Sequence, residues 1–230
     1  PTTACIPFDR ARVVCTESAM MESKESKESM ENVEEAQAVQ DARAVIERIE
    51  RVFTEREHVF VAIDGPCASG KTTLAALLQR RFDGNVLHMD DFFLRPEQRT
   101  PERFAEPGGN VDRERFEEEV LAPLVAGNIV QYRPWDCHTG DFAASHSVEP
   151  ARLTIVEGSY SMHPALREYY DLMICLMIDS NEQLRRLEAR NPRMLQRFID
   201  EWIPLENRYF EQTGTRAIAN MVVDTAKSNE

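Results

Sequence analysis

The chain has 230 residues, enough for one α/β domain with a full hydrophobic core. Its net charge of −13, from 27 basic and 40 acidic residues, argues against binding to nucleic acid or to an anionic membrane. The five cysteines are scattered without a Cys-x-x-Cys pair, which predicts free thiols in a reducing compartment rather than a disulfide framework or zinc site. No apolar run approaches the ~20 residues that cross a bilayer, and no basic segment followed by an apolar one marks a signal peptide, so we expect a cytoplasmic protein.

The N-terminal part is predicted to be an acidic, flexible extension over residues 1–38, followed by one domain over residues 39–230. Residues 17–35 are rich in Glu, Ser, Lys and Met and include the run ESKESKES. Such a segment buries too little apolar surface to offset the entropy lost on ordering. Apolar residues between Val39 and Phe53 then recur at helical spacing, which predicts an amphipathic helix packed on the core.

A strand, a glycine-rich loop and a helix are predicted in succession between residues 58 and 82. Residues 58–64 form a short apolar run typical of a buried strand, and residues 72–82 carry apolar side chains at helical spacing. Between them, residues 65–72 read Gly-Pro-Cys-Ala-Ser-Gly-Lys-Thr and fit the pattern G-x-x-x-x-G-K-[ST]. Because this pattern requires a preceding strand and a following helix, the context supports a phosphate-binding P-loop.

Each residue of the loop has an expected role. Gly65 and Gly70 let the backbone turn its N–H groups inward, and the helix that follows adds partial positive charge. Lys71 should reach the β- and γ-phosphates of ATP, and the hydroxyl of Thr72 should ligate Mg²⁺. Cys67 is either a thiol with a pKa lowered by the helix N-terminus or a small residue at an unconstrained position. The predicted nucleotide-binding residues are Gly65, Ala68, Ser69, Gly70, Lys71, Thr72 and Thr73.

Beyond the loop, strand patterns alternate with helix patterns. Strands are predicted at 85–89, 129–132, 153–157, 172–179 and 219–224, with a long loop over 95–110 and a helix from Asp112 to about Ala126. Leu195, Phe198, Trp202, Leu205 and Tyr209 repeat at helical spacing and predict a stripe packed in the core. The alternation predicts an α/β fold, with a three-layer, doubly wound and mostly parallel sheet.

Acidic residues stand at the carboxyl ends of several predicted strands. Asp90 and Asp91 come after the strand at 85–89, and Glu157 ends the strand at 153–157. In doubly wound sheets, ligands bind at the carboxyl ends of the strands. An acid there can hold a Mg²⁺ shell or accept a proton from an attacking hydroxyl, or it can be a simple turn residue. We expect Glu157 to join Thr72 as a metal ligand.

Four elements share a pattern with one family: the loop 65–72, Asp90-Asp91-Phe92-Phe93, Asn110-Val111-Asp112 with Phe116, and Tyr132 followed by His138. Together they resemble the uridine kinase and nicotinamide riboside kinase group of P-loop kinases, over about residues 58–225. The Asp-Asp-Phe-Phe element is the most discriminating of them, since the loop is common to many NTPases.

The resemblance implies roles for residues on the acceptor side. Asp90 would be the general base for a sugar hydroxyl, with Asp91 as the alternative if the register differs by one. Asp112 would bind ribose hydroxyls, although the residue also suits the N-cap of the helix that follows it. Tyr132 and His138 would contact the base, at a spacing one residue longer than in uridine kinases.

The resemblance also implies an arginine-bearing lid over about residues 185–200. Arginines at 185, 186, 190, 193 and 197 would clamp the phosphates during transfer, and Arg190 is preferred as the catalytic one, ahead of Arg186 and Arg193. The alternative is a solvated helix face with local charge pairs.

These observations predict an ATP-dependent kinase that phosphorylates a hydroxyl of a small, nucleoside-like and ribose-containing metabolite. The predicted catalytic residues are Lys71, Asp90 and Arg190, and the predicted substrate-binding residues are Asp91, Asp112, Tyr132 and His138. Two alternatives stay open: a kinase of another metabolite, of the pantothenate or sugar type, and a non-catalytic nucleotide-binding regulatory module. The sequence leaves the oligomeric state undetermined, with a homo-oligomer among the alternatives.

Overall fold

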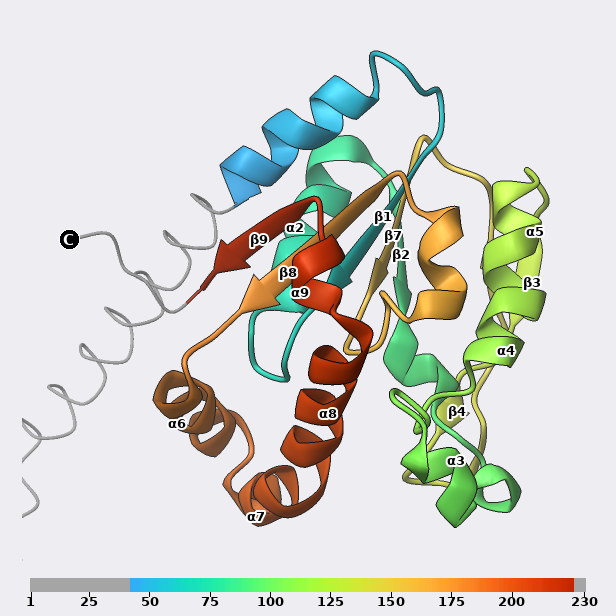
Figure 1. Ribbon diagram of the computed structural model, residues 1–230. Coiled ribbons are helices and arrows are strands. Elements are labelled where there is room, and N and C mark those ends of the chain that lie inside the picture. The colour runs from blue at the N-terminus through green and yellow to red at the C-terminus, as the bar shows by residue number, and fades with distance from the viewer. Residues whose placement is uncertain (1–41, 226–230) are drawn as a thin grey trace, which may run out of the picture. The chain divides into compact units, whose positions relative to one another are not determined.

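The computed structural model describes residues 42–225, and the predicted extension over residues 1–38 lies outside them. At the core is a sheet of five parallel strands in the order β2-β7-β1-β8-β9 (Figure 1). The strands are β1 (Val59–Asp64), β2 (Asn85–His88), β7 (Leu153–Glu157), β8 (Leu172–Met177) and β9 (Met221–Asp224). The predicted parallel α/β sheet is therefore confirmed.

Hydrophobic side chains on both faces of the sheet make two cores, which gives the three predicted layers. All residues of β1 and β7 are buried, as expected for strands covered on both faces. On one face, the helix over residues 42–52 and α2 (Lys71–Phe82) pack against Val59, Val61 and Ile63. On the other face, Phe60 packs beneath the helical segment that follows Asp112. Alternate residues of β1 thus face opposite layers.

The segment after Asp112 is helical from residue 113 to residue 125, close to the predicted bounds. It comprises α4 (Arg113–Phe116), a π-helical turn over Glu117–Leu121 and α5 (Ala122–Val125). The preceding segment was predicted to be a loop, but it contains α3 (Pro101–Ala105). Thr100 caps this short helix by accepting a hydrogen bond from the N–H of Arg103, and a proline occupies its first turn.

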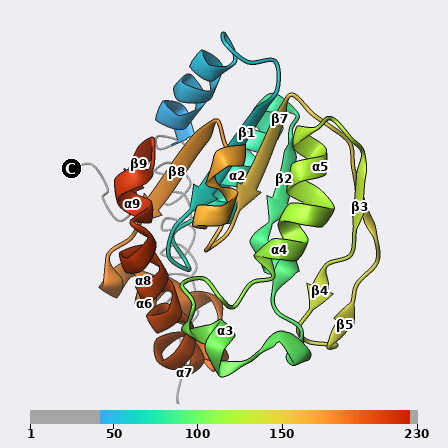
Figure 2. The same ribbon diagram turned by 45° about the vertical axis from the view of Figure 1, so that its right-hand side comes forward.

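The predicted strand at 129–132 forms, but not in the parallel sheet. It is β3 (Val130–Tyr132) and pairs antiparallel with β6 (His146–Val148), while β4 (Trp135–Asp136) pairs with β5 (Asp141–Phe142). Figure 2 shows β3 and the β4–β5 hairpin beyond α4 and α5, apart from the central sheet. A local apolar run predicts a strand but not its partner, because pairing depends on distant residues.

The C-terminal part is mainly helical before β9. Its helices are α6 (Ser180–Arg190), α7 (Leu195–Arg197), a π-helical turn (Phe198–Trp202), α8 (Ile203–Thr213) and α9 (Thr215–Ile218). The predicted stripe is helical, but of its five residues Tyr209 alone is fully buried. The prediction that the stripe packs in the core is therefore correct only for Tyr209. No helix within residues 42–225 is both long and apolar enough to span a membrane.

Candidate functional site

The P-loop adopts the backbone conformation that its glycines permit. Gly65 and Gly70 have φ angles of 151° and 92°, values that residues with a side chain rarely adopt. A Cβ atom on Gly65 would lie 2.5 Å from the carbonyl oxygen of Leu176, so both the conformation and the space require glycine at this position.

The first turn of α2 follows the loop directly and has no side-chain cap. The helix begins at Lys71 with no acidic residue in its first turn, although the chain carries 40 acidic residues. The first N–H groups of a helix have no partner within it, and the helix dipole adds positive charge there. The ammonium of Lys71 lies in the same region, where its Nζ donates to the carbonyl oxygens of Gly65 and Pro66, each at 2.8 Å. This end of α2 is therefore suited to a phosphate group.

Thr72 and Glu157, whose role as metal ligands stays a prediction, contact each other because β7 lies next to β1 in the sheet. The hydroxyl of Thr72 donates to Oε1 of Glu157 at 3.2 Å, and Nδ1 of His88 lies 2.6 Å from the same oxygen. Glu157 raises the pKa of His88, because it accepts this hydrogen bond and carries a negative charge. A hydroxyl and a carboxylate are oxygen ligands that suit Mg²⁺, which keeps few protein ligands in nucleotide sites. Residues 42–225 contain no group of three or more His, Cys, Asp or Glu side chains arranged to hold a metal.

Asp90 lies in the turn Met89–Phe92, directly after β2. Asp90 is exposed to solvent, yet nearby protein atoms surround much of its carboxyl group. The resulting partial desolvation raises the pKa of Asp90. Lys71 opposes the shift, whereas the charges of Glu157 and Glu206 add to it. A carboxylate with a raised pKa is a better proton acceptor, so the environment suits the predicted base.

Two of the predicted substrate residues bind each other. The hydroxyl of Tyr132 donates to Oδ2 of Asp91 at 3.0 Å, and the Tyr132 ring stacks on Phe92 with centroids 5.2 Å apart. Tyr132 is buried, so its ring is part of the core. His138 is exposed in the turn between β4 and β5, where its backbone N–H donates to Oδ1 of Asp136. Contacts of Tyr132 and His138 with a base stay predictions.

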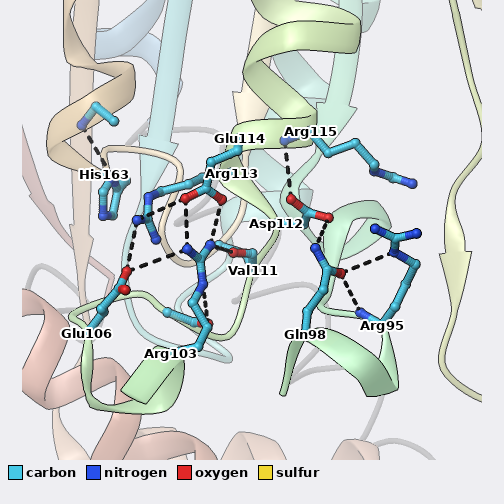
Figure 3. Close-up of polar contacts among 12 residues, drawn as sticks. Arg95, Gln98, Arg103, Glu106, Val111, Asp112, Arg113, Glu114, Arg115 and His163 are labelled. Atoms are coloured by element: carbon cyan, nitrogen blue, oxygen red, sulfur yellow. Dashed lines mark hydrogen bonds and ion pairs between the residues drawn. The ribbon is translucent and has the colours of Figure 1, made fainter. Parts of the chain in front are cut away.

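Asp112 caps α4, as its alternative role predicted. Its Oδ1 accepts a hydrogen bond from the N–H of Arg115 at 3.2 Å, and its Oδ2 accepts one from Gln98 at 2.7 Å (Figure 3). Both carboxylate oxygens are therefore engaged within the protein. A ribose hydroxyl would have to join or replace Gln98, and that contact stays a prediction.

Ion pairs hold the segment between β2 and α4 in place. Arg103 binds both oxygens of Glu114, at 2.7 and 2.6 Å, and donates to the carbonyl oxygen of Val111 at 2.8 Å (Figure 3). Arg113 binds Glu106 at 2.8 Å. This network connects α3 and the residues after it to the first turn of α4, next to Asp112.

Among the predicted lid arginines, Arg186 contacts the P-loop. Its Nη1 donates to the carbonyl oxygen of Ala68 at 3.3 Å, and its Nη2 to that of Thr225 at 2.9 Å. Arg197 pairs with Glu201 at 2.9 Å. Arg190 is exposed at the last residue of α6, and its catalytic role stays a prediction.

Asp64 organises the base of the loop, a role that the sequence analysis did not assign. It is fully buried and accepts hydrogen bonds from the N–H groups of Gly65 (2.7 Å), Tyr160 (3.1 Å) and Met162 (2.8 Å) and from the hydroxyl of Tyr209 (2.7 Å). Burial raises the pKa of Asp64 to about 6. A signal was available, since Asp64 ends a predicted strand just as Glu157 does.

Cys67 contacts two further residues that the sequence did not suggest. Its N–H donates to Glu206, and its carbonyl oxygen and Sγ accept from Gln183. Burial and the charge of Glu206 raise the pKa of Cys67 to about 12, so the proposed lowering by the helix N-terminus does not occur. The three cysteines within residues 42–225 are free thiols, as predicted.

Comparisons with known proteins show which solved structures have a similar fold. No family model matches the sequence, and no curated protein matches it significantly. Among solved structures, a possible uridine kinase from Bacillus stearothermophilus matches with a TM-score of 0.59 and 22% identity, over 79% of this chain and 100% of that one. A protein from Silicibacter sp. TM1040, assigned as a fructose transport system kinase, matches with a TM-score of 0.54 and 22% identity, over 81% and 98% of the two chains. The chain therefore shares the fold of these two structures, and the predicted resemblance is confirmed at the level of the fold.

Proposed function

We propose that the protein is an ATP-dependent kinase that transfers a phosphoryl group to a hydroxyl of a small, nucleoside-like metabolite. The observation that carries the proposal is the position of Glu157. Its strand β7 lies between β1 and β2, where Glu157 is in register with Ile63 on one side and His88 on the other. The P-loop follows β1 and Asp90 follows β2, so donor-side and acceptor-side groups flank one carboxylate at the same edge of the sheet.

On the donor side, the first turn of α2 and Lys71 would bind the phosphates. The Lys71 ammonium, which here bonds to carbonyl oxygens of its own loop, would turn to phosphate oxygens and balance the charge that develops during transfer. Thr72 and Glu157 would hold Mg²⁺, which neutralises phosphate charge when bound. Arg186, already in contact with Ala68, can add a guanidinium with little movement.

On the acceptor side, Asp90 would orient the hydroxyl and accept its proton. Phosphoryl transfer proceeds through a loose transition state, so positioning contributes more than basicity. Asp91 is held by the Tyr132 hydroxyl, and this bond fixes the turn that carries Asp90. The acceptor hydroxyl would therefore meet a carboxylate carried on a turn that the protein holds in place.

Acceptor screening tests the proposal. Purified protein with Mg²⁺ and ATP is offered nucleosides, sugars and pantothenate, with ADP release and product mass as readouts. We expect acceptor-dependent turnover with a ribose-containing compound, and Lys71→Ala should abolish it while unfolding stays cooperative. Turnover with sugars or pantothenate alone would reassign the acceptor class. Nucleotide binding without turnover on any alcohol would refute the kinase and favour a regulatory module.

A further inference from the structure

The backbone of Cys67 is hydrogen-bonded to α6, which includes the start of the predicted lid (residues 185–200), and to α8, which follows the lid. The Cys67 N–H donates to Oε2 of Glu206 on α8 at 2.9 Å. Nε2 of Gln183 on α6 donates to the Cys67 carbonyl oxygen at 3.0 Å. Gln183 precedes the predicted lid in the chain and Glu206 follows it, so the segments that flank the lid both contact one residue of the P-loop.

Each helix makes a second contact three residues further on. On α6, Arg186 donates to the Ala68 carbonyl oxygen at 3.3 Å. On α8, the hydroxyl of Tyr209 donates to Oδ2 of Asp64 at 2.7 Å. Residues three apart share one face of a helix, so each helix presents a single face to the loop.

Glu206 is a buried carboxylate whose partners are polar groups of the site. It is 5% exposed, and it also accepts a hydrogen bond from the Ser159 hydroxyl at 2.7 Å. A buried charge is tolerated when it is paired in this way. The N–H groups in the first turn of α2 are not used by Glu206, so the carboxylate engages the loop without occupying the groups that suit phosphate.

Ser159 provides a physical link between Lys71 and Glu206. Its hydroxyl lies 3.0 Å from the carbonyl oxygen of Gly65, as well as 2.7 Å from Glu206, and its one proton can serve only one acceptor at a time. Lys71 donates to the same Gly65 oxygen. When Lys71 turns to a bound phosphate, the Ser159 hydroxyl can rotate and donate to the Gly65 carbonyl oxygen instead. Glu206 then loses the hydrogen bond from Ser159 and can shift.

We propose that Gln183 and Glu206 are positioning residues that fasten the two ends of the lid to the P-loop at Cys67, so that nucleotide binding is transmitted to the lid arginines. The proposal rests on the proposed function only in that a nucleotide binds at the P-loop. Neither residue touches the reacting atoms, and neither belongs to the P-loop motif.

Trypsin cleavage at the lid arginines tests this coupling. The rates are measured by mass spectrometry with and without saturating Mg²⁺–AMP-PNP, in wild type, Gln183→Ala, Glu206→Ala and Glu206→Gln. We expect the nucleotide to slow cleavage of the wild type roughly tenfold, a typical magnitude for coupling between sites. Gln183→Ala and Glu206→Ala should lose most of this protection, while Glu206→Gln, which can still accept from Cys67, should keep it. Glu211→Gln, an exposed change on the same helix, is the matched control.

The outcomes separate the proposal from its alternatives. Full protection in Glu206→Ala and Gln183→Ala at saturating nucleotide would overturn it, because the lid would then respond without either contact. Tighter AMP-PNP binding by Glu206→Gln would also overturn it, since Glu206 would then be an anion that competes with phosphate. If Glu206→Ala does not fold, Gln183→Ala alone decides between protection and its loss. Failure of the wild type to bind AMP-PNP would instead refute the proposed function.

Discussion

Replacing Asp64 by Asn tests how the base of the P-loop is held. The substitution keeps the shape of the side chain but removes its charge. One oxygen still accepts from Gly65 and Tyr160, while an amide NH₂ group takes the place of Oδ2, which accepts from Met162 and Tyr209. The Tyr209 hydroxyl can rotate and accept from the new amide. The Met162 N–H cannot, and a buried donor without a partner costs about 1–3 kcal/mol.

The charge of Asp64 adds a pH dependence with a definite sign. Burial raises the pKa of Asp64 from 3.8 to about 6, so the folded protein binds this proton more tightly than the unfolded chain does. Its stabilising contribution is therefore present at low pH and is lost as the pH rises through about 6. Between about pH 5 and about pH 7.5, linkage gives a loss on the order of 1 kcal/mol in the wild type. Asp64→Asn has no proton to lose, so its destabilisation relative to wild type should be smaller at the higher pH by this amount.

Urea unfolding at both pH values, followed by tryptophan fluorescence and circular dichroism, measures the difference. Comparing variant with wild type at each pH cancels the titration of all other groups. Asp200→Asn, at an exposed acid in the π-helical turn Phe198–Trp202, is the control and should show the same difference from wild type at both pH values. A pH-independent effect of Asp64→Asn, or one that grows toward neutral pH, would refute the reasoning.

Three further predictions concern the site itself. Asp90→Asn should lower kcat about a hundredfold or more with AMP-PNP affinity unchanged in calorimetry; equal losses of both would assign the carboxylate to nucleotide or metal binding. Tyr132→Phe removes the hydrogen bond to Asp91 but keeps the ring, so the KM for the acceptor should rise while the KM for ATP stays constant, and a change confined to ATP would contradict the assignment. Iodoacetamide at about pH 8 should label Cys137, which is exposed, well before Cys67, whose pKa is raised to about 12; equal labelling rates in peptide mass spectra would show that the P-loop thiol is more acidic than its surroundings imply.

The parts of the site that the sequence predicts are those set by neighbouring residues. The P-loop needs only a strand, a turn and a helix in succession, and residues 58–82 contain all three. Asp90 and Glu157 were found because they end apolar runs, and parallel strands bring such ends to one edge. The sequence does contain a start signal for α3, because Thr100 stands directly before a proline. The proline and glycine residues of the segment favoured a loop instead.

The parts that the sequence did not predict depend on pairings between distant segments. Glu206 and Gln183 meet Cys67 because two helices dock against the loop, and no motif or period marks either residue. β3 was predicted as a strand, but it lies outside the central sheet because it pairs with β6. Helical spacing in the stripe that ends at Tyr209 predicted the helix, whereas burial depends on what covers each position.

The order of the central strands has a consequence for how the protein acquires its site during folding. β7 comes later in the chain than β1 and β2, yet it pairs with both of them. Until β7 inserts, β1 and β2 share no neighbour, and the P-loop and Asp90 have no fixed separation. Closing such long-range pairs costs chain entropy before any contact is gained, which makes this step slow compared with helix formation. A nascent chain that ends before residue 153 therefore carries the P-loop motif without a site in which to use it.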